Sequence, residues 1–186
     1  MFMGVLPVHI EDVTTVTNLG IDIPLDKMVP DDGQSDYDTE ESAGVVYRIK
    51  EPKATALIFS SGKIVCTGTK SIREAEEAIR SVVERIKELG VEVSSEPEME
   101  IEKIVAAFRL KDSMNLEELA PKLEGARYDT EKLPGIVYRT DEPTAEFLIL
   151  ERKIICTCGK SIKEVQAAMK KLKEKLEKAG ARVELV

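Results

Sequence analysis

Hydrophobic and polar positions follow two periods along this chain, and these periods predict strands and helices in a fixed order. Residues 10–19 and 101–110 are strand-like segments. Shorter strand-like segments follow at residues 45–49, 54–59 and 63–68, with Ser60, Ser61 and Gly62 as the turn between the last two. Beyond Ser71, apolar residues recur every three or four positions, which predicts an amphipathic helix.

The whole pattern occurs twice. Residues 37–40 (Tyr-Asp-Thr-Glu) recur 91 positions later at residues 128–131, and residues 44–48 are matched in the same way by residues 135–139. From Lys63, which is matched by Lys153, the displacement is 90, so the second copy lacks one residue in a turn. Two copies of this length indicate a pseudo-twofold duplicated fold rather than a solenoid. We expect a tail over residues 1–9 and repeats over 10–95 and 96–186.

Each copy is expected to close with a helix that covers one face of the sheet. Ser71-x-x-Glu74 and Ser161-x-x-Glu164 are capping boxes, and a glycine ends each helix, Gly90 or Gly180. A shorter helix is predicted after Asn115, whereas Pro30 to Gly33 would stop its counterpart soon after Leu25. A helix with one apolar stripe covers one side of a sheet, so the fold class is α+β with the other side facing outward.

That outward side is itself apolar. If Ile58 and Cys66 face the helix, the alternation points Leu57, Val65 and their neighbours away from it. An exposed apolar sheet face predicts a binding surface, and the simpler alternative is that it packs on a partner subunit.

Charge and composition limit the function. The chain has 27 Lys and Arg against 35 Asp and Glu, for a net charge of −8, so any nucleic-acid surface must be local. No segment resembles a signal peptide or a membrane span, so we expect a soluble intracellular protein. The three cysteines form no disulfide framework or zinc site. The simplest interpretation of Cys66 and Cys156 is that they are core residues. No nucleophile lies with a histidine, and no phosphate loop or acidic metal cluster is present, so we expect neither catalysis nor a cofactor.

One segment carries a family resemblance. Val46 to Ser71 reads Val-Tyr-Arg-x-x-Glu-Pro-Lys-x-x-Ala-Leu-Ile-Phe-Ser-Ser-Gly-Lys-x-Val-Cys-Thr-Gly-x-Lys-Ser, which resembles the core of the TATA-box-binding proteins. The resemblance extends from about Ile10 to Val183, with a weaker second copy, and is of the archaeal type. It implies a saddle, in which one curved antiparallel sheet of ten strands carries helices on its convex side. The concave face would lie on a widened minor groove and kink the DNA with apolar wedges.

The resemblance also implies roles for single residues. The family's two pairs of wedge phenylalanines fall on Ser42 and Phe59 and on Leu133 and Leu150, so one of the four remains. Its paired central asparagines fall on Asp12 and Lys103. Because the groove offers acceptor atoms and flanking phosphates, the carboxylate of Asp12 should weaken binding, and Lys103 should partly offset this. The other positions expected to contact the groove are Thr14, Leu57, Val65, Thr67, Val105, Leu148, Ile155 and Thr157. Those expected to contact phosphates are Arg48, Lys63, Lys70, Arg139, Lys153 and Lys160.

Partners follow from the resemblance. Asp129 and Glu131 match the acidic loop with which the family engages transcription factor B and, through it, the RNA polymerase machinery. In the absence of DNA, we expect a homodimer that forms through the concave face. The expected location is cytoplasmic and associated with the nucleoid. Two hypotheses remain. The chain is either a divergent initiation factor that binds promoter DNA with weakened or altered specificity, or an interaction module or regulator of this fold that has lost productive DNA binding.

Overall fold

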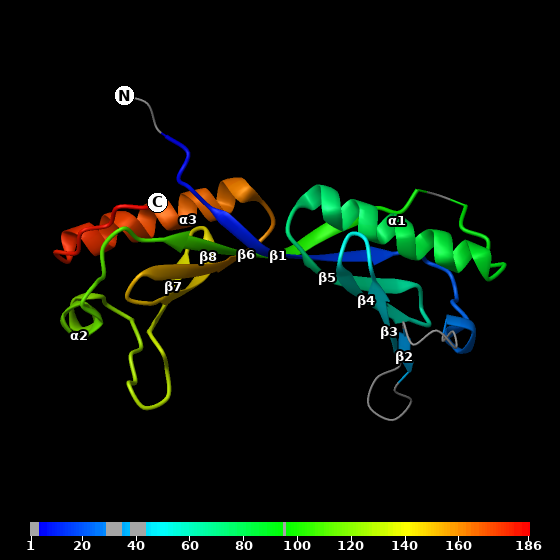
Figure 1. Cartoon of the computed structure of the whole chain (residues 1–186), viewed down its shortest axis with the longest axis horizontal. Coiled ribbons are helices and arrows are strands. Elements are labelled where there is room, and N and C mark those ends of the chain that lie inside the picture. Colours follow the sequence, from blue (N-terminus) through cyan, green and yellow to red (C-terminus); the bar gives the residue numbers. More distant parts are fainter. Residues whose placement is uncertain (1–3, 29–34, 38–43, 95) are drawn as a thin grey trace. The chain divides into compact units, whose positions relative to one another are not determined.

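The computed structural model describes residues 4–28, 35–37, 44–94 and 96–186 (Figure 1). Contacts divide the chain into two units. The first unit is Asp12–Glu102, and the second unit is Lys103–Val186 together with the start of the chain, Met1–Glu11. Each unit is an antiparallel sheet with one long helix packed on one face (Figure 1). The predicted α+β class and the predicted order of elements are confirmed in both units.

In the first unit the strand order is β2-β3-β4-β5-β1, and neighbouring strands are antiparallel. Where the sequence left a stunted helix or a loop open, the chain forms a short 3-10 helix, η1. The elements are β1 (His9–Asn18), η1 (Leu25–Met28), β2 (Ser35–Tyr37), β3 (Gly44–Ile49), β4 (Ala54–Phe59), β5 (Lys63–Thr69) and α1 (Ile72–Glu88).

In the second unit the strand order is β6-β9-β8-β7. The counterpart of β2 is an isolated bridge, in which Arg127 and Val137 exchange backbone hydrogen bonds of 2.9 and 2.8 Å. The pairing stops there because the chain enters a turn at Asp129, so the ten strands that the resemblance implied are nine in the described residues. The elements are β6 (Met99–Arg109), α2 (Leu116–Leu119), η2 (Ala120–Lys122), β7 (Ile136–Asp141), β8 (Thr144–Ile149), β9 (Lys153–Cys158) and α3 (Ile162–Lys178).

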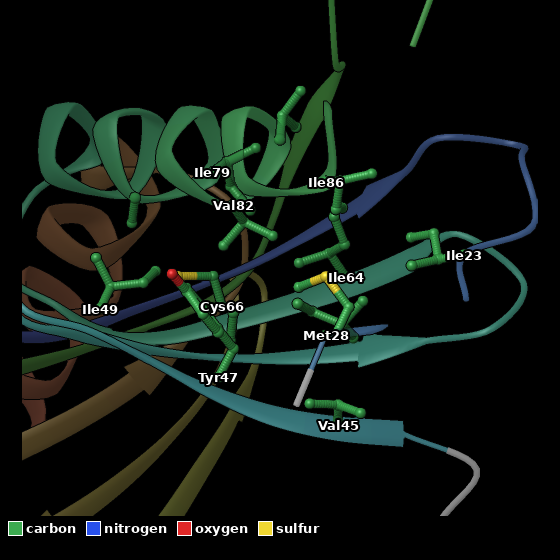
Figure 2. Close-up of a cluster of buried hydrophobic side chains, with 14 of the residues drawn as sticks. Ile23, Met28, Val45, Tyr47, Ile49, Ile64, Cys66, Ile79, Val82 and Ile86 are labelled. Atoms are coloured by element: carbon green, nitrogen blue, oxygen red, sulfur yellow. The ribbon is translucent and has the colours of Figure 1, made fainter. Parts of the chain in front are cut away.

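The core of the first unit lies between α1 and the sheet. Figure 2 shows Ile79, Val82 and Ile86 pointing from the helix toward Ile64 and Cys66 on β5. All five side chains are at most 2% exposed. Cys156 is equally buried at the matching position of β9, so both predicted core cysteines are confirmed.

The long helices begin as predicted. Ser71 Oγ accepts a hydrogen bond from the backbone N of Glu74 at 3.0 Å, and Ser161 Oγ accepts one from Glu164 at 3.2 Å. Each glutamate in turn accepts from the residue before the N-cap, Lys70 or Lys160, at 2.8 Å. Two orphan amides are therefore satisfied at each start. None of the helices in the described part of the chain is long and apolar enough to cross a membrane.

Candidate nucleic-acid interface

The outer face of the first unit, meaning the side of its sheet away from α1, carries a strip of half-buried apolar residues. Leu57 lies directly opposite Val65, which lies opposite Val16 on β1. These side chains are partly exposed, whereas Ile58 and Cys66 between them are fully buried. The predicted inward and outward alternation is therefore confirmed, and the strip crosses three neighbouring strands.

The second unit repeats this arrangement. Leu148 pairs with Ile155, and Val105 pairs with Thr157 on the next strand. All four are partly exposed. The residues predicted to contact the groove are thus brought together in each unit, apart from Thr14. Thr14 is 2% exposed, and its hydroxyl donates to Asp12 Oδ2 at 2.7 Å.

A glycine stands beside one predicted wedge position in each unit, Phe59 at the end of β4 and Leu150 directly after β8. A Cβ on Gly44 would lie 3.1 Å from Leu57 Cδ1 and 3.4 Å from Phe59 Cδ1, and one on Gly135 would lie 2.9 Å from Leu150 Cδ2. The Cβ would also meet a backbone carbonyl oxygen of the paired segment, that of Ile58 at Gly44 and that of Ile149 at Gly135, so a side chain at either position would disturb the strand pairing as well as the outer-face residues. Leu133 is half-buried, and Ser42 lies outside the described residues.

The carboxylate of Asp12 accepts hydrogen bonds from two residues of its own unit. Its Oδ1 accepts from the backbone N of Gly68 at 2.5 Å, and its Oδ2 accepts from Thr14. Both oxygens are thus engaged where the β1–β5 register shifts between Val13 and Thr15. Its charge still acts on the core, because burial and then the negative charge of Asp12 raise the pKa of the Cys66 thiol to about 11. The carboxylate is therefore a structural group of the first unit, and the effect on DNA binding that the sequence suggested for it stays a prediction.

Two of the four basic residues predicted to contact DNA in the second unit are paired with carboxylates. Arg139 Nε and Nη2 lie 2.7 and 2.6 Å from Glu146 Oε2, and Lys153 Nζ lies 2.7 Å from Glu11 Oε1. Lys160 is exposed, as is Lys103. In the first unit, Arg48, Lys63 and Lys70 are also exposed, with Lys63 Nζ 6.0 Å from the centre of the Phe59 ring.

Glu146 is a residue of this face that sequence reasoning missed. The signal was present, because β7 and β8 form a hairpin and the alternation that points Leu148 outward also points Glu146 outward. A comparison restricted to the positions that the family uses for DNA contacts passes over it.

The predicted partner loop is held by Asp129. Its Oδ1 accepts from the backbone N of Glu131 at 3.1 Å, and its carbonyl oxygen accepts from Lys132 and Leu133 at 3.1 and 2.7 Å. Lys132 Nζ also lies 3.9 Å from its carboxylate. Asp129 is half-buried, and Glu131 is exposed. Glu131 therefore presents the more accessible charge of the two.

The described residues hold no cluster of three His, Cys, Asp or Glu that could bind a metal. The thiols are also poor nucleophiles at neutral pH, because burial first and the neighbouring Cys158 second raise the pKa of Cys156 to about 12.

Comparison with known proteins supports this description. The family model described as "Transcription factor TFIID (or TATA-binding protein, TBP)" matches residues 7–89 and 98–179. TATA-box-binding protein B of Halobacterium salinarum is 39% identical over 176 residues, covering 93% of this chain and 95% of the relative. The TATA-box-binding protein of Archaeoglobus fulgidus is also 39% identical over 176 residues, covering 93% and 96%. The solved structure of Methanococcus jannaschii TBP matches with a TM-score of 0.84 and 36% identity, over 92% of this chain and 98% of that one. These similarities span both repeats and confirm the fold that the resemblance implied.

Proposed function

Because this chain belongs to the TATA-binding protein family of transcription factors, we propose that it binds promoter DNA in the minor groove through the outer faces of its two units. Membership of this family also confirms the expectation that the protein is not an enzyme.

The observation that carries the proposal is the matched pair of apolar strips. Each strip combines aliphatic residues with a threonine, Val65 with Thr67 in one unit and Ile155 with Thr157 in the other. Such a surface suits the floor of an A·T-rich minor groove, which shows few polar groups apart from acceptors. Exposed lysines and arginines at the strand ends supply the phosphate contacts that bring affinity without reading sequence.

We propose that the specificity of this binding is altered or weakened relative to the family. Lys103 replaces one central asparagine with a cation that donates to any acceptor, and Asp12 replaces the other with a carboxylate already engaged by Gly68 and Thr14. Leu133 and Leu150 replace aromatic wedges, so a bend in the DNA should be weaker at the end bound by the second unit.

Binding to TATA-containing and scrambled duplexes over a series of salt concentrations tests this proposal. Affinity should fall by about 0.9 log units per log unit of salt for each neutralised phosphate, with a modest preference for the TATA duplex. Val65→Glu with Ile155→Glu should abolish binding, because two carboxylates then face the groove. Ala167→Glu, on the exposed surface of α3, serves as the matched control and should bind like the unaltered protein. Binding that is absent at low salt, or insensitive to salt, contradicts the proposal.

We propose further that Asp129 and Glu131 recruit transcription factor B and, with it, RNA polymerase. Charge complementarity mainly sets the association rate, so Asp129→Lys with Glu131→Lys should slow assembly of the ternary complex and flatten its salt dependence. The same changes at Asp38 and Glu40, which lie outside the described residues, are the control from the first repeat. Equal effects of the two pairs would indicate general electrostatics rather than a site.

The second candidate function is a protein-interaction module without productive DNA binding. The carboxylate of Glu146 on the outer face, and the pairing of Lys153 with Glu11, favour it. Under this hypothesis the apolar strips form a homodimer interface. Sedimentation should then show a dimer that duplex DNA does not dissociate, whereas a DNA-binding protein should become monomeric on the duplex.

A further inference from the structure

Helix α3 of the second unit is a basic element in an acidic protein (Figure 1). It carries six lysines and three glutamates, a formal charge of +3, whereas the whole chain carries −8. The matching helix α1 carries four basic and five acidic residues, a formal charge of −1. The excess of positive charge therefore belongs to the second unit, on the helix side of its sheet and opposite the face proposed for DNA.

Three lysines converge on a hollow of about 550 Å³ beside the end of α3. Lys175 and Lys178 come from the last turn of the helix, and Lys122 comes from η2. A Cβ on Gly180, just beyond the helix, would lie 4.0 Å from Lys122 Nζ. Two elements that are distant in sequence therefore bring their charges to one place.

The hollow holds more positive charge than its own residues neutralise. Lys175 Nζ donates to the hydroxyl of Tyr138 at 2.6 Å, so its position is fixed by a group without a formal charge. Lys122 and Lys178 form no ion pair within the described part of the chain. Of the described residues that line the hollow, Glu124 alone is acidic, so the lining has a formal charge of +2.

The helix end itself explains only part of this charge. Lysines in a last turn complement the partial negative charge of the helix C-terminus, which suits Lys175 and Lys178 but not Lys122, a residue of another element. The matching residues of α1 are Arg85 and Glu88, whose side chains pair at 3.2 Å. A long helix of this fold can therefore end without unpaired positive charge at these two positions.

The floor of the hollow favours a peptide over a nucleic acid. Leu123 and Tyr138 line it and are only 6% and 4% exposed, so apolar groups lie between the lysines. An apolar centre with a charged rim is the usual arrangement of a protein interface. The carboxylates of a peptide can also be spaced to meet separate ammonium groups and to avoid Glu124.

We propose that this hollow docks an acidic segment of a partner protein, whose carboxylates pair with Lys122, Lys175 and Lys178. The partner would then occupy the helix side of the second unit and leave the outer face available for a duplex. This surface is separate from the loop of Asp129 and Glu131, whose charge is of the opposite sign. The inference does not depend on the proposed DNA binding.

A fluorescein-labelled peptide of about ten glutamates serves as the probe, and fluorescence anisotropy measures its binding to the full chain at low salt. Affinity should fall as salt rises, because exposed charges are screened over about 10 Å at 0.1 M salt. Lys122→Gln with Lys178→Gln should weaken binding by about 2- to 30-fold, as expected for the loss of two exposed ion pairs. Lys87→Gln with Lys163→Gln removes the same charge from exposed positions of α1 and α3 outside the hollow, and should bind like the unaltered protein.

Carbodiimide cross-linking locates the contact, because it joins a carboxylate directly to a lysine amine with the loss of water. Mass spectrometry of the product should identify Lys122, Lys175 or Lys178 as the main site of attachment. Attachment chiefly at lysines outside the hollow would overturn the inference.

Three further results would contradict it. These are no binding of the peptide at low salt, an equal loss of binding in the two double variants, and displacement of the peptide by a TATA duplex. The second would indicate general electrostatics, and the third would mean that the peptide and the DNA share one surface. The Lys122→Gln, Lys178→Gln variant should bind the duplex like the unaltered protein, so failure of this inference leaves the proposed function standing. Peptide binding without DNA binding would contradict the proposed function alone.

Discussion

The two units share one hydrogen-bonded framework and differ in what fills and covers it. On the helix side, Phe108 and Phe147 are fully buried in the second unit, whereas the matching residues of the first unit are Thr17 and Ala56. Among the described residues, the hydroxyls of Thr15 and Thr17 are buried without a hydrogen-bond partner. On the outer face it is the second unit that carries the additional polar group, the carboxylate of Glu146. The strand pairing is therefore the same in the two units, whereas the core packing and the surface charge differ between them. The second unit has buried aromatic rings where the first has a threonine and an alanine, and it carries a carboxylate on the outer face where the first carries Thr55.

The largest expected effect concerns the aromatic core of the second unit. Phe147→Ala should lower the free energy of unfolding by about 3–5 kcal/mol, because it removes a fully buried ring and leaves a cavity. Urea denaturation measures the change. Leu148→Ala, on the next residue but on the half-exposed outer face, is the control and should cost clearly less. Equal losses would mean that the buried ring of Phe147 contributes no more to stability than an outer-face side chain.

Cys66 and Cys156 occupy matching positions, and their thiols should affect the pH dependence of stability in the same way in both units. Cys66 and Cys156 have pKa values raised to about 11 and about 12, first by burial in each case. A thiol whose folded pKa lies above its unfolded value of 9.0 stabilises the fold fully below about pH 9 and loses that contribution as pH rises toward the folded pKa. Each thiol should therefore contribute a loss of up to about 1.4 kcal/mol per pH unit above pH 9. Unfolding measured at pH 8 and pH 10.5 should show a smaller pH-dependent loss in Cys66→Ala or Cys156→Ala than in the unaltered protein. An unchanged loss in both variants would place its origin in the other titrating groups.

The polar core of the first unit gives the next effect. Thr17→Val keeps the shape of the side chain and removes a buried hydroxyl without a partner, so it should raise the free energy of unfolding by about 1 kcal/mol. Thr157→Val, on the half-exposed outer face, should change it by less than about 0.5 kcal/mol. A loss of stability in Thr17→Val would show that the hydroxyl is satisfied in solution, for instance by a buried water.

Much of this fold could be predicted from the sequence because its signals are local and repeated. Ser71 and Ser161 begin equivalent helices, and the alternation around Leu57 and Leu148 separates core from surface. What could not be predicted depends on contacts between distant segments. The backbone N of Gly68 reaches Asp12 across 56 residues of sequence, and no periodicity reports such a bond. The orphan hydroxyl of Thr17 is likewise visible only once the surrounding core is placed. Glu146 is intermediate, because its outward direction is readable from the alternation and its importance appears only beside Arg139.

The smallest expected effect is on stability, and it determines how the DNA experiments are interpreted. The Arg139–Glu146 pair is exposed to solvent, and exposed ion pairs contribute about 0–1 kcal/mol, so Glu146→Gln should change the free energy of unfolding by less than about 0.5 kcal/mol. The amide oxygen can still accept from the guanidinium, which reduces the change further. Urea denaturation at low and high salt measures it, since screening should remove whatever difference exists. A loss of 1 kcal/mol or more would mean that the pair holds the β7–β8 hairpin, and a change in DNA affinity would then report a distorted outer face. With stability unchanged, the same variant removes one charge from the outer face of the second unit without disturbing its fold.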